Sequence, residues 1–258
     1  MRVRKPSSGF EWLCRLLLWL GALLGPLPAA AQADYARERR WAEQILPSVL
    51  VGEPVDLALG GGRKFLALWT PAPGAAAGVV VVHGMGVHPD WGLINPLRSR
   101  LAEQGYATLS VQMPVAAAEA RGGDYPPLFP EAAERLQAAV AFLRGKGLRK
   151  IAIVAHSMGA RMADYFLSHA AEPGVEAWVA IGISGEFSER AASRVPVLDL
   201  YGEKDYPAVR ENAGRRAAAI QAARGSAQVE VAGADHFFAG KEEDLVRHVR
   251  MFLDRRLK

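Results

Sequence analysis

Cysteine is almost absent from this sequence of 258 residues. The one cysteine, Cys14, lies close to the N-terminus. A single cysteine cannot form a disulfide within the chain, and it cannot supply a metal site made of several thiolates. If the segment around Cys14 is removed during maturation, catalysis by a thiol is excluded as well.

A long apolar run is also missing. The run from Leu16 to Gly25 is about half of the ~20 residues that a membrane-spanning helix needs, and Arg15 and Pro26 bracket it. A basic start, a short apolar run and then small residues are typical of a secretory signal peptide. We therefore expect residues 1–33 to be a signal peptide. The mature protein would be exported, periplasmic or secreted, with no stable membrane span.

Two cleavage positions fit this segment. Ala31 and Ala33 suit a cut before Asp34, whereas Ala29 and Ala31 permit a cut before Gln32. We expect the cut before Asp34.

A strong excess of one charge is absent once this segment is set aside. The net charge of +4 includes Arg2, Arg4, Lys5 and Arg15, which only Glu11 opposes in the segment. The rest of the chain is close to neutral, and no basic stripe alternates with aromatic residues. Binding to nucleic acid thus loses its compositional support.

Residues 34–54 predict a short helical extension. Trp41, Ile45 and Val49 are four residues apart, as on one face of a helix, and Pro47 interrupts the pattern. Most stripes of this kind face a core, so we expect the helix to pack against the domain.

Residues 55–258 predict one α/β domain, because apolar strand patterns alternate with helical ones. A hairpin around the glycines at 60–62 comes first, and helices between the later strands imply right-handed crossovers. We expect about eight strands in a mostly parallel sheet, with helices on both faces and the first pair as an antiparallel edge. The predicted strands are "VDLAL", "KFLALW", "GVVVVHG", "YATLSVQM", "KIAIVAHS", "EAWVAIGIS", "PVLDLYG" and "AQVEVAG". The helical patterns are Ile94, Leu97 and Leu101; Leu136, Val140 and Leu143; Met158, Met162 and Phe166; Val209, Ala213 and Ile220; and Leu245, Val249 and Phe252.

Four unusual sequences follow predicted strands: "HGMG", "HSMG", "YGEKD" and "GADHF". In a parallel sheet the carboxyl ends of the strands form the binding rim. A serine hydroxyl needs a base to take its proton, and the base needs an acid to hold its tautomer. Ser157, Asp205 and His236 fit these roles, in the chain order expected of an α/β-hydrolase.

The chain from about Val55 to the C-terminus resembles the α/β-hydrolase-fold serine hydrolases. Its nucleophile elbow is "AHSMG", Ala155 to Gly159, in which alanine replaces the usual first glycine. The segments "RWAEQILPS", "HGMGVHPDW" and "VLDLYGEKD" also resemble a little-characterised family of secreted bacterial α/β-hydrolases. The resemblance implies this fold and export, and an oxyanion hole made by the backbone N–H groups of Met158 and Met85.

Other carboxylates compete with Asp205 for the role of the acid. Glu186 follows the sixth predicted strand, where some relatives have their acid, and Asp199 lies within an apolar strand. We interpret Asp199 as a structural hydrogen-bonding group, and Asp235 as a brace for the loop that holds His236.

The long connection "MPVAAAEARGGDYPPLFP" has no helical or strand period, and loops of this length are often functional. We therefore expect Arg121, Tyr125 and Phe129 to contact substrate, and His88 or Trp91 to border the pocket. His83, His88 and Asp90 do not have ligand spacing that indicates a metal site. The connection "GEFSERAASRV" is too short for a lid domain.

These observations predict an exported serine hydrolase. The expected reaction is cleavage of a carboxylic ester, or of a thioester or amide, in a small molecule, through an acyl-enzyme and without a cofactor. The alternative is a non-catalytic envelope protein that uses the same fold as a binding surface, with the Trp41 helix or the Arg121 loop as its contact.

Overall fold

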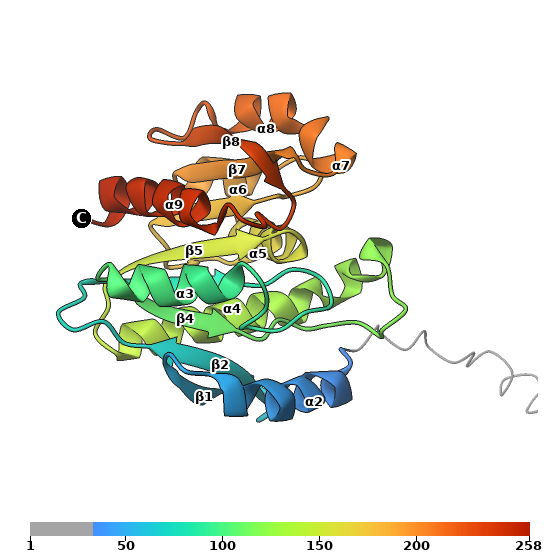
Figure 1. Ribbon diagram of the computed structural model, residues 1–258, viewed down its shortest axis with the longest axis vertical. Helices are drawn as coiled ribbons and strands as arrows, with labels where there is room; N and C mark the ends of the chain where they lie inside the picture. Colours follow the sequence, from blue (N-terminus) through green and yellow to red (C-terminus); the bar gives the residue numbers. More distant parts are fainter. Residues whose placement is uncertain (1–32) are drawn as a thin grey trace, which may run out of the picture. The chain divides into compact units, whose positions relative to one another are not determined.

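An eight-stranded sheet runs through the protein in the strand order β1-β2-β4-β3-β5-β6-β7-β8 (Figure 1). The structure is a computed structural model that describes residues 33–258, so the predicted signal peptide up to residue 32 lies outside the described residues. The strands are β1 (Glu53–Ala58), β2 (Lys64–Thr70), β3 (Ala77–Val82), β4 (Ala107–Val111), β5 (Lys150–His156), β6 (Ala177–Ile181), β7 (Val197–Lys204) and β8 (Ala227–Asp235). The predicted strand number is confirmed.

The sheet is mostly parallel, with an antiparallel edge. Strands β1 and β2 form an antiparallel hairpin, β2 pairs antiparallel with β4, and every later pairing is parallel. Gly62 in the hairpin turn has φ +80°, a conformation that glycine adopts without steric cost. The predicted hairpin and edge are therefore confirmed.

Helices cover both faces of the sheet. Apolar side chains of α3 and α9 pack on one face with Val79, Val81 and Val154, while α4, α5 and α6 pack on the other with Val80 and Val82 (Figure 1). Alternate residues of β3 thus enter opposite cores, as strand geometry requires. The helices are α2 (Tyr35–Ile45), α3 (Ile94–Glu103), α4 (Phe129–Gly145), α5 (Met158–His169), α6 (Glu189–Arg194), α7 (Pro207–Arg210), α8 (Ala213–Ile220) and α9 (Glu242–Leu257).

One helical pattern is divided in the structure. Val209, Ala213 and Ile220 share a helical spacing, but they belong to two helices, α7 and α8. The buried guanidinium of Arg216 donates to the carbonyl oxygens of Val209 and Gly185. The Val209 carbonyl is thereby used by a side chain, which suits a helix end at this point.

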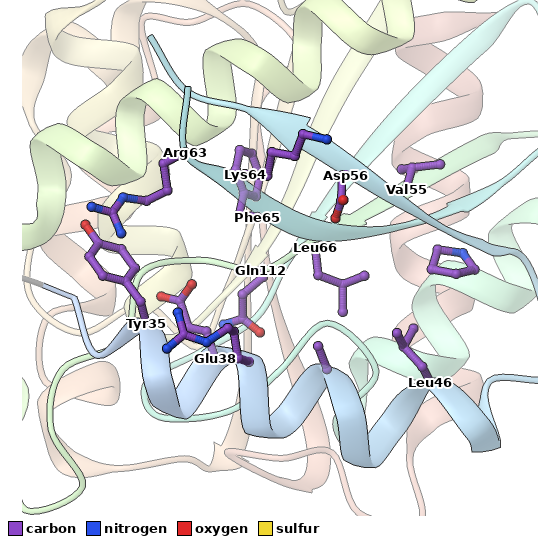
Figure 2. A pocket seen from close by; sticks show the side chains of 13 residues that line it. Tyr35, Glu38, Leu46, Val55, Asp56, Arg63, Lys64, Phe65, Leu66 and Gln112 are labelled. Atoms are coloured by element: carbon purple, nitrogen blue, oxygen red, sulfur yellow. The ribbon is translucent and has the colours of Figure 1, made fainter. Parts of the chain in front are cut away.

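Helix α2 packs against the domain, as predicted, and ends at Ile45 before a short 3₁₀ turn, Leu46–Ser48, that contains Pro47. The Asp34 carboxylate accepts a hydrogen bond from the Arg37 N–H and caps the helix. Figure 2 shows α2 beside the β1–β2 hairpin, with a cavity of about 420 Å³ between them. The predicted extension over 34–54 corresponds to α2, this turn and the first residues of β1.

The connection between β6 and β7 contains only the short helix α6, so the described residues form no lid domain there. Between residues 33 and 258, no helix combines the length and the apolar character that crossing a membrane requires.

Candidate active site

Ser157 occupies the sharp turn between β5 and α5. Its backbone has φ 55° and ψ −120°, outside the region that non-glycine residues favour. The Ser157 N–H donates to the Ile181 carbonyl oxygen at 2.8 Å, which ties the turn to β6. At Gly159 a Cβ atom would collide with the His83 carbonyl and the Val82 side chain, so only glycine fits here. The elbow therefore has the strand–turn–helix context that its sequence predicts.

A hydrogen-bonded chain joins Ser157, His236 and Asp205. Ser157 Oγ lies 2.9 Å from His236 Nε2, and His236 Nδ1 lies 2.6 Å from Asp205 Oδ1. An ionised carboxylate only accepts hydrogen bonds, so Nδ1 carries the proton and Nε2 is free to accept the serine proton. Asp205 is 3% exposed and His236 is 5% exposed, so the hydrogen bonds between these side chains are shielded from water.

Backbone groups hold the two partners of the serine in place. Asp205 Oδ1 also accepts from the Tyr206 N–H at 2.8 Å. Asp235 Oδ1 accepts from the Phe237 and Ala239 N–H groups, so it braces the loop around His236 as expected. At Gly182 a Cβ atom would lie 3.1 Å from His236 Nδ1, closer than an ordinary van der Waals contact, so a side chain here would crowd the imidazole.

The other carboxylates lie elsewhere. Glu186 forms an ion pair with Arg215 at 2.9 Å on the surface. Asp199 is fully buried against the Arg216 guanidinium and the Gln228 amide, which agrees with its interpretation as a structural group. Neither carboxylate contacts the His236 ring, so the geometry favours Asp205 as its acidic partner.

The backbone N–H groups of Met158 and Met85 have no acceptor within residues 33–258. Gly84 precedes Met85 and packs close to the elbow, since a Cβ atom on it would lie 3.3 Å from Ser157 Cβ. Two N–H groups next to the serine are what an oxyanion hole requires.

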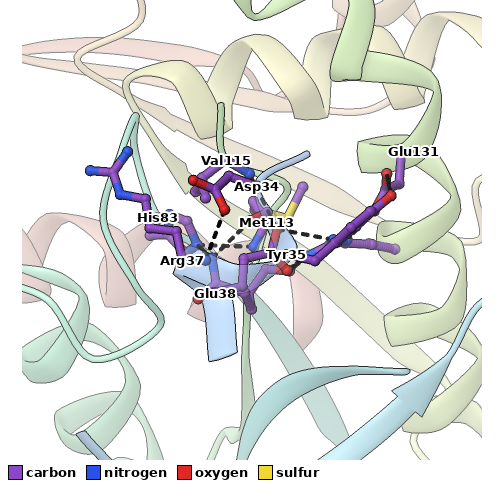
Figure 3. Close-up of polar contacts among 10 residues, drawn as sticks. Asp34, Tyr35, Arg37, Glu38, His83, Met113, Val115 and Glu131 are labelled. Carbon is purple, nitrogen blue, oxygen red and sulfur yellow. Dashed lines mark hydrogen bonds and ion pairs between the residues drawn. The ribbon is translucent and has the colours of Figure 1, made fainter. Parts of the chain in front are cut away.

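His83 fixes the peptide that carries the Met85 N–H. Its Nδ1 lies 2.8 Å from the Gly84 carbonyl oxygen, and its Nε2 accepts from the Met113 N–H at 2.9 Å, a contact drawn in Figure 3. Nε2 is therefore unprotonated and Nδ1 donates. In a trans peptide the C=O and the following N–H point in opposite directions, so a fixed Gly84 carbonyl also fixes the Met85 N–H. Burial lowers the pKa of His83 to about 3, which keeps the ring neutral.

His156, the residue before the nucleophile, supports His236 from behind. Its Nε2 donates to the His236 carbonyl oxygen at 3.0 Å, and the two ring centroids are 4.8 Å apart. Its Nδ1 has no partner among the described residues. Burial, followed by the nearby His236, lowers the pKa of His156 to about 3, so this ring is also neutral. In the sequence His156 is only a residue of the elbow, and no local pattern indicates its contact with His236, which is 80 residues away.

A pocket of about 120 Å³ opens at Ser157. Apart from the elbow, His236 and Gly84, its walls are Met85, Val87, Trp91, Tyr206 and Phe237. Of His88 and Trp91, either of which was expected to border the pocket, Trp91 does so. Tyr206 and Phe237 were missed, although each directly follows a residue of the predicted triad in the sequence.

The predicted substrate contacts do not line this pocket. Tyr125 and Phe129 are buried in the hydrophobic core, and the Phe129 ring lies edge-on to that of Tyr165 in α5. Arg121 is exposed, with its backbone N–H bonded to Asp124. His88 lies against the Trp41 ring, with centroids 6.0 Å apart. The loop does approach the site at Gly122, where a Cβ atom would lie 3.6 Å from the Met158 side chain.

The larger cavity in Figure 2 shares no residue with the pocket at Ser157. We locate the candidate active site at the smaller pocket because the hydrogen-bonded Ser157, His236 and Asp205 lie there. In the part of the chain that the structure describes, no cluster of three or more histidine, cysteine, aspartate or glutamate side chains could hold a metal ion.

Solved structures share this fold at low sequence identity. A protein of unknown function from Agrobacterium tumefaciens is 19% identical, with a TM-score of 0.64 over 80% of this chain and 96% of that one. An esterase of Pyrococcus furiosus is 17% identical (TM-score 0.62, 80% and 93% covered). A serine hydrolase without a lid from Xanthomonas campestris is 16% identical (TM-score 0.63, 80% and 95% covered). The protein therefore has the α/β-hydrolase fold.

No curated protein matches the sequence. A family model described as "Protein of unknown function (DUF3530)" matches residues 22–126 and 129–255, which is most of the chain. The match includes the elbow, both loops of the triad and helix α2. The chain belongs to this family of unknown function, DUF3530.

Proposed function

We propose that the protein is an exported serine hydrolase that cleaves carboxylic esters, with Ser157 as nucleophile, His236 as base and Asp205 as the acid that orients it. The observation that carries this proposal is the continuous hydrogen-bonded chain of 2.9 Å and 2.6 Å through the imidazole. The esterase activity for which the P. furiosus protein of the same fold is named accords with it.

The reaction follows from the positions of these groups. His236 Nε2 takes the Ser157 proton while Oγ bonds to the carbonyl carbon, and the N–H groups of Met158 and Met85 hold the oxygen that becomes negative. The tetrahedral intermediate then expels the alcohol, whose oxygen receives the proton from His236. Water, activated by the same imidazole, releases the acid from the acyl-enzyme and restores Ser157.

Covalent labelling with a fluorophosphonate tests the proposal. The reagent phosphonylates an activated serine, so the mature protein should be labelled at neutral pH and Ser157→Ala should not. Ser193→Ala, an exposed serine in α6, is the matched control and should label like the wild type. A mature protein that stays unlabelled would contradict the proposal and favour the non-catalytic binding protein.

Export is a separate part of the proposal and rests on the N-terminal sequence. If the chain is processed before Asp34, the N-terminal peptide of the protein recovered from outside the cytoplasm should begin at Asp34, and mass spectrometry will show it. A mature N-terminus at Gln32 would support export with the other cleavage position. An intact N-terminus would contradict removal of a signal peptide.

A further inference from the structure

The entrance to the pocket at Ser157 is unusually apolar for a surface. Among the described residues, Met85 is 44% exposed, Tyr206 51% and Phe237 40%, and all three border this pocket. Large apolar side chains that gather on a surface mark a binding site more often than isolated ones do. The exposed apolar rim is therefore the surface on which a substrate of Ser157 would bind.

The pocket at Ser157 is small and half open to solvent. Its volume of about 120 Å³ corresponds to about four water-sized groups at ~30 Å³ each. No aspartate, glutamate, lysine or arginine is among its described lining residues, so no permanently charged side chain is available to pair with a charged substrate. Val87 and Trp91 provide apolar wall. The pocket thus suits a short, uncharged group.

The proton transfer from His236 decides where the alcohol group and the acyl group of the ester lie. The leaving oxygen must receive a proton from His236 Nε2, so the alcohol lies beside the residues that flank this imidazole. Tyr206 and Phe237 are these residues, with ring centroids 4.4 Å and 5.1 Å from that of His236. The alcohol then rests on the exposed rings of Tyr206 and Phe237. The acyl group occupies the side of the pocket lined by Val87 and Trp91, where the Trp91 ring contacts Phe237 edge-on with centroids 5.4 Å apart.

We propose that the preferred substrates are uncharged esters of a short acyl group, of about two to four carbons, with a bulky aromatic or apolar alcohol. This inference rests on the proposed serine hydrolase function and adds the substrate class. The aromatic rim binds the alcohol by stacking, while the pocket volume limits the acyl chain.

Two series of esters test the proposal with the purified mature protein. The first varies the acyl chain from acetyl to decanoyl with 4-nitrophenol as the constant alcohol. The second keeps acetyl and compares naphthyl acetate with ethyl acetate. We expect kcat/KM to fall steeply beyond butyryl in the first series, and KM to be lower for naphthyl acetate in the second.

Two variants test where the alcohol group and the acyl group bind. Tyr206→Ala should raise KM for naphthyl acetate by roughly threefold to tenfold relative to ethyl acetate, as expected for the loss of one aromatic contact. Trp91→Ala should shift the optimum to longer acyl chains. Met251→Ala, an exposed methionine on α9 outside the pocket lining, is the control and should change neither preference.

The outcomes separate this inference from the proposed function. A labelled, active protein whose kcat/KM rises up to octanoyl, or that prefers ethyl acetate, would overturn the substrate class and leave the serine hydrolase intact. A protein that neither reacts with fluorophosphonate nor cleaves any ester of the series would overturn both. A chain-length limit that Trp91→Ala does not move would show that the acyl group lies elsewhere.

Discussion

The backbone of Ser157 is held in a conformation that costs energy, and its neighbours maintain it. A non-glycine residue at φ 55° and ψ −120° costs on the order of 1–3 kcal/mol. The N–H bond to Ile181 and the close contact of Gly159 with the end of β3 oppose relaxation of this turn. The result is a hydroxyl that projects from the elbow toward His236 rather than into the core.

Asp205→Asn should reduce kcat by about three to four orders of magnitude. An asparagine can donate to Nδ1, which favours the wrong imidazole tautomer, with the proton on Nε2 facing the serine. The change is nearly isosteric, so the thermal unfolding midpoint should stay close to that of the wild type. Steady-state ester hydrolysis measures the effect, and a variant with undiminished kcat would remove Asp205 from the triad.

If the Met85 N–H binds the oxyanion of the transition state as proposed, His83→Leu should lower kcat by about tenfold to a hundredfold, with KM nearly unchanged. His83→Gln keeps a side-chain amide that can donate to the Gly84 carbonyl, so it should recover part of the loss. His169→Leu, an exposed histidine at the end of α5, serves as the control. If KM rises while kcat is kept, His83 does not act through the oxyanion hole.

At the scale of elements, helix α2 is attached by a buried ion pair. Arg135 of α4 is 0% exposed; its guanidinium contacts the Glu38 carboxylate at 2.9 Å and Glu131 at 2.6 Å. Glu38 also accepts from the Val115 N–H, in the loop that follows β4 (Figure 3). Burial raises the pKa of Glu38, and Arg135 opposes this effect. Arg135 therefore joins α2 to α4 and to the segment that follows β4, where it also donates to the Gln112 carbonyl oxygen.

Glu38→Ala should lower the free energy of unfolding by about 3 kcal/mol, because the buried Arg135 guanidinium loses one of its two carboxylate partners. Glu43→Ala changes an exposed glutamate of the same helix and should cost far less. Urea unfolding of the two variants compares them directly. Equal losses would mean that the ion pair does not hold α2.

The elements that sequence predicts well are those with strong local patterns. The runs "GVVVVHG" and "KIAIVAHS" became β3 and β5, and Ser157, Asp205 and His236 follow strands that the parallel order brings to one edge of the sheet. Contacts over long separations are not visible in local patterns. The Glu38–Arg135 pair spans 97 residues, and nothing near either residue indicates the other. Tyr125 and Phe129 lie in a segment whose sequence has no helical or strand period, yet both are buried in the core, where Phe129 begins α4 and packs against Tyr165 of α5.

In the molecule as a whole, two fully buried and neutral histidines should each contribute a loss of stability in mild acid. Burial lowers the pKa of both His83 and His156 to about 3. In the unfolded chain a histidine has a pKa of about 6.5, so below this value the unfolded state binds protons that the folded state cannot bind. The contribution of these two histidines to the free energy of unfolding therefore falls as pH decreases from 6.5 toward 3, by up to about 1.4 kcal/mol per pH unit for each histidine.

His156→Gln isolates one of these two contributions. Glutamine does not titrate and can donate to the His236 carbonyl as the imidazole does, so the variant should fold and keep its support of His236. Its free energy of unfolding should depend less steeply on pH between 6.5 and 5 than that of the wild type. Buried carboxylates with a raised pKa, such as Asp199 and Glu38, act in the opposite direction, but they are common to both proteins and cancel in the comparison. Urea unfolding at half-unit steps of pH gives both slopes, and equal slopes would mean that His156 takes up its proton in the folded protein.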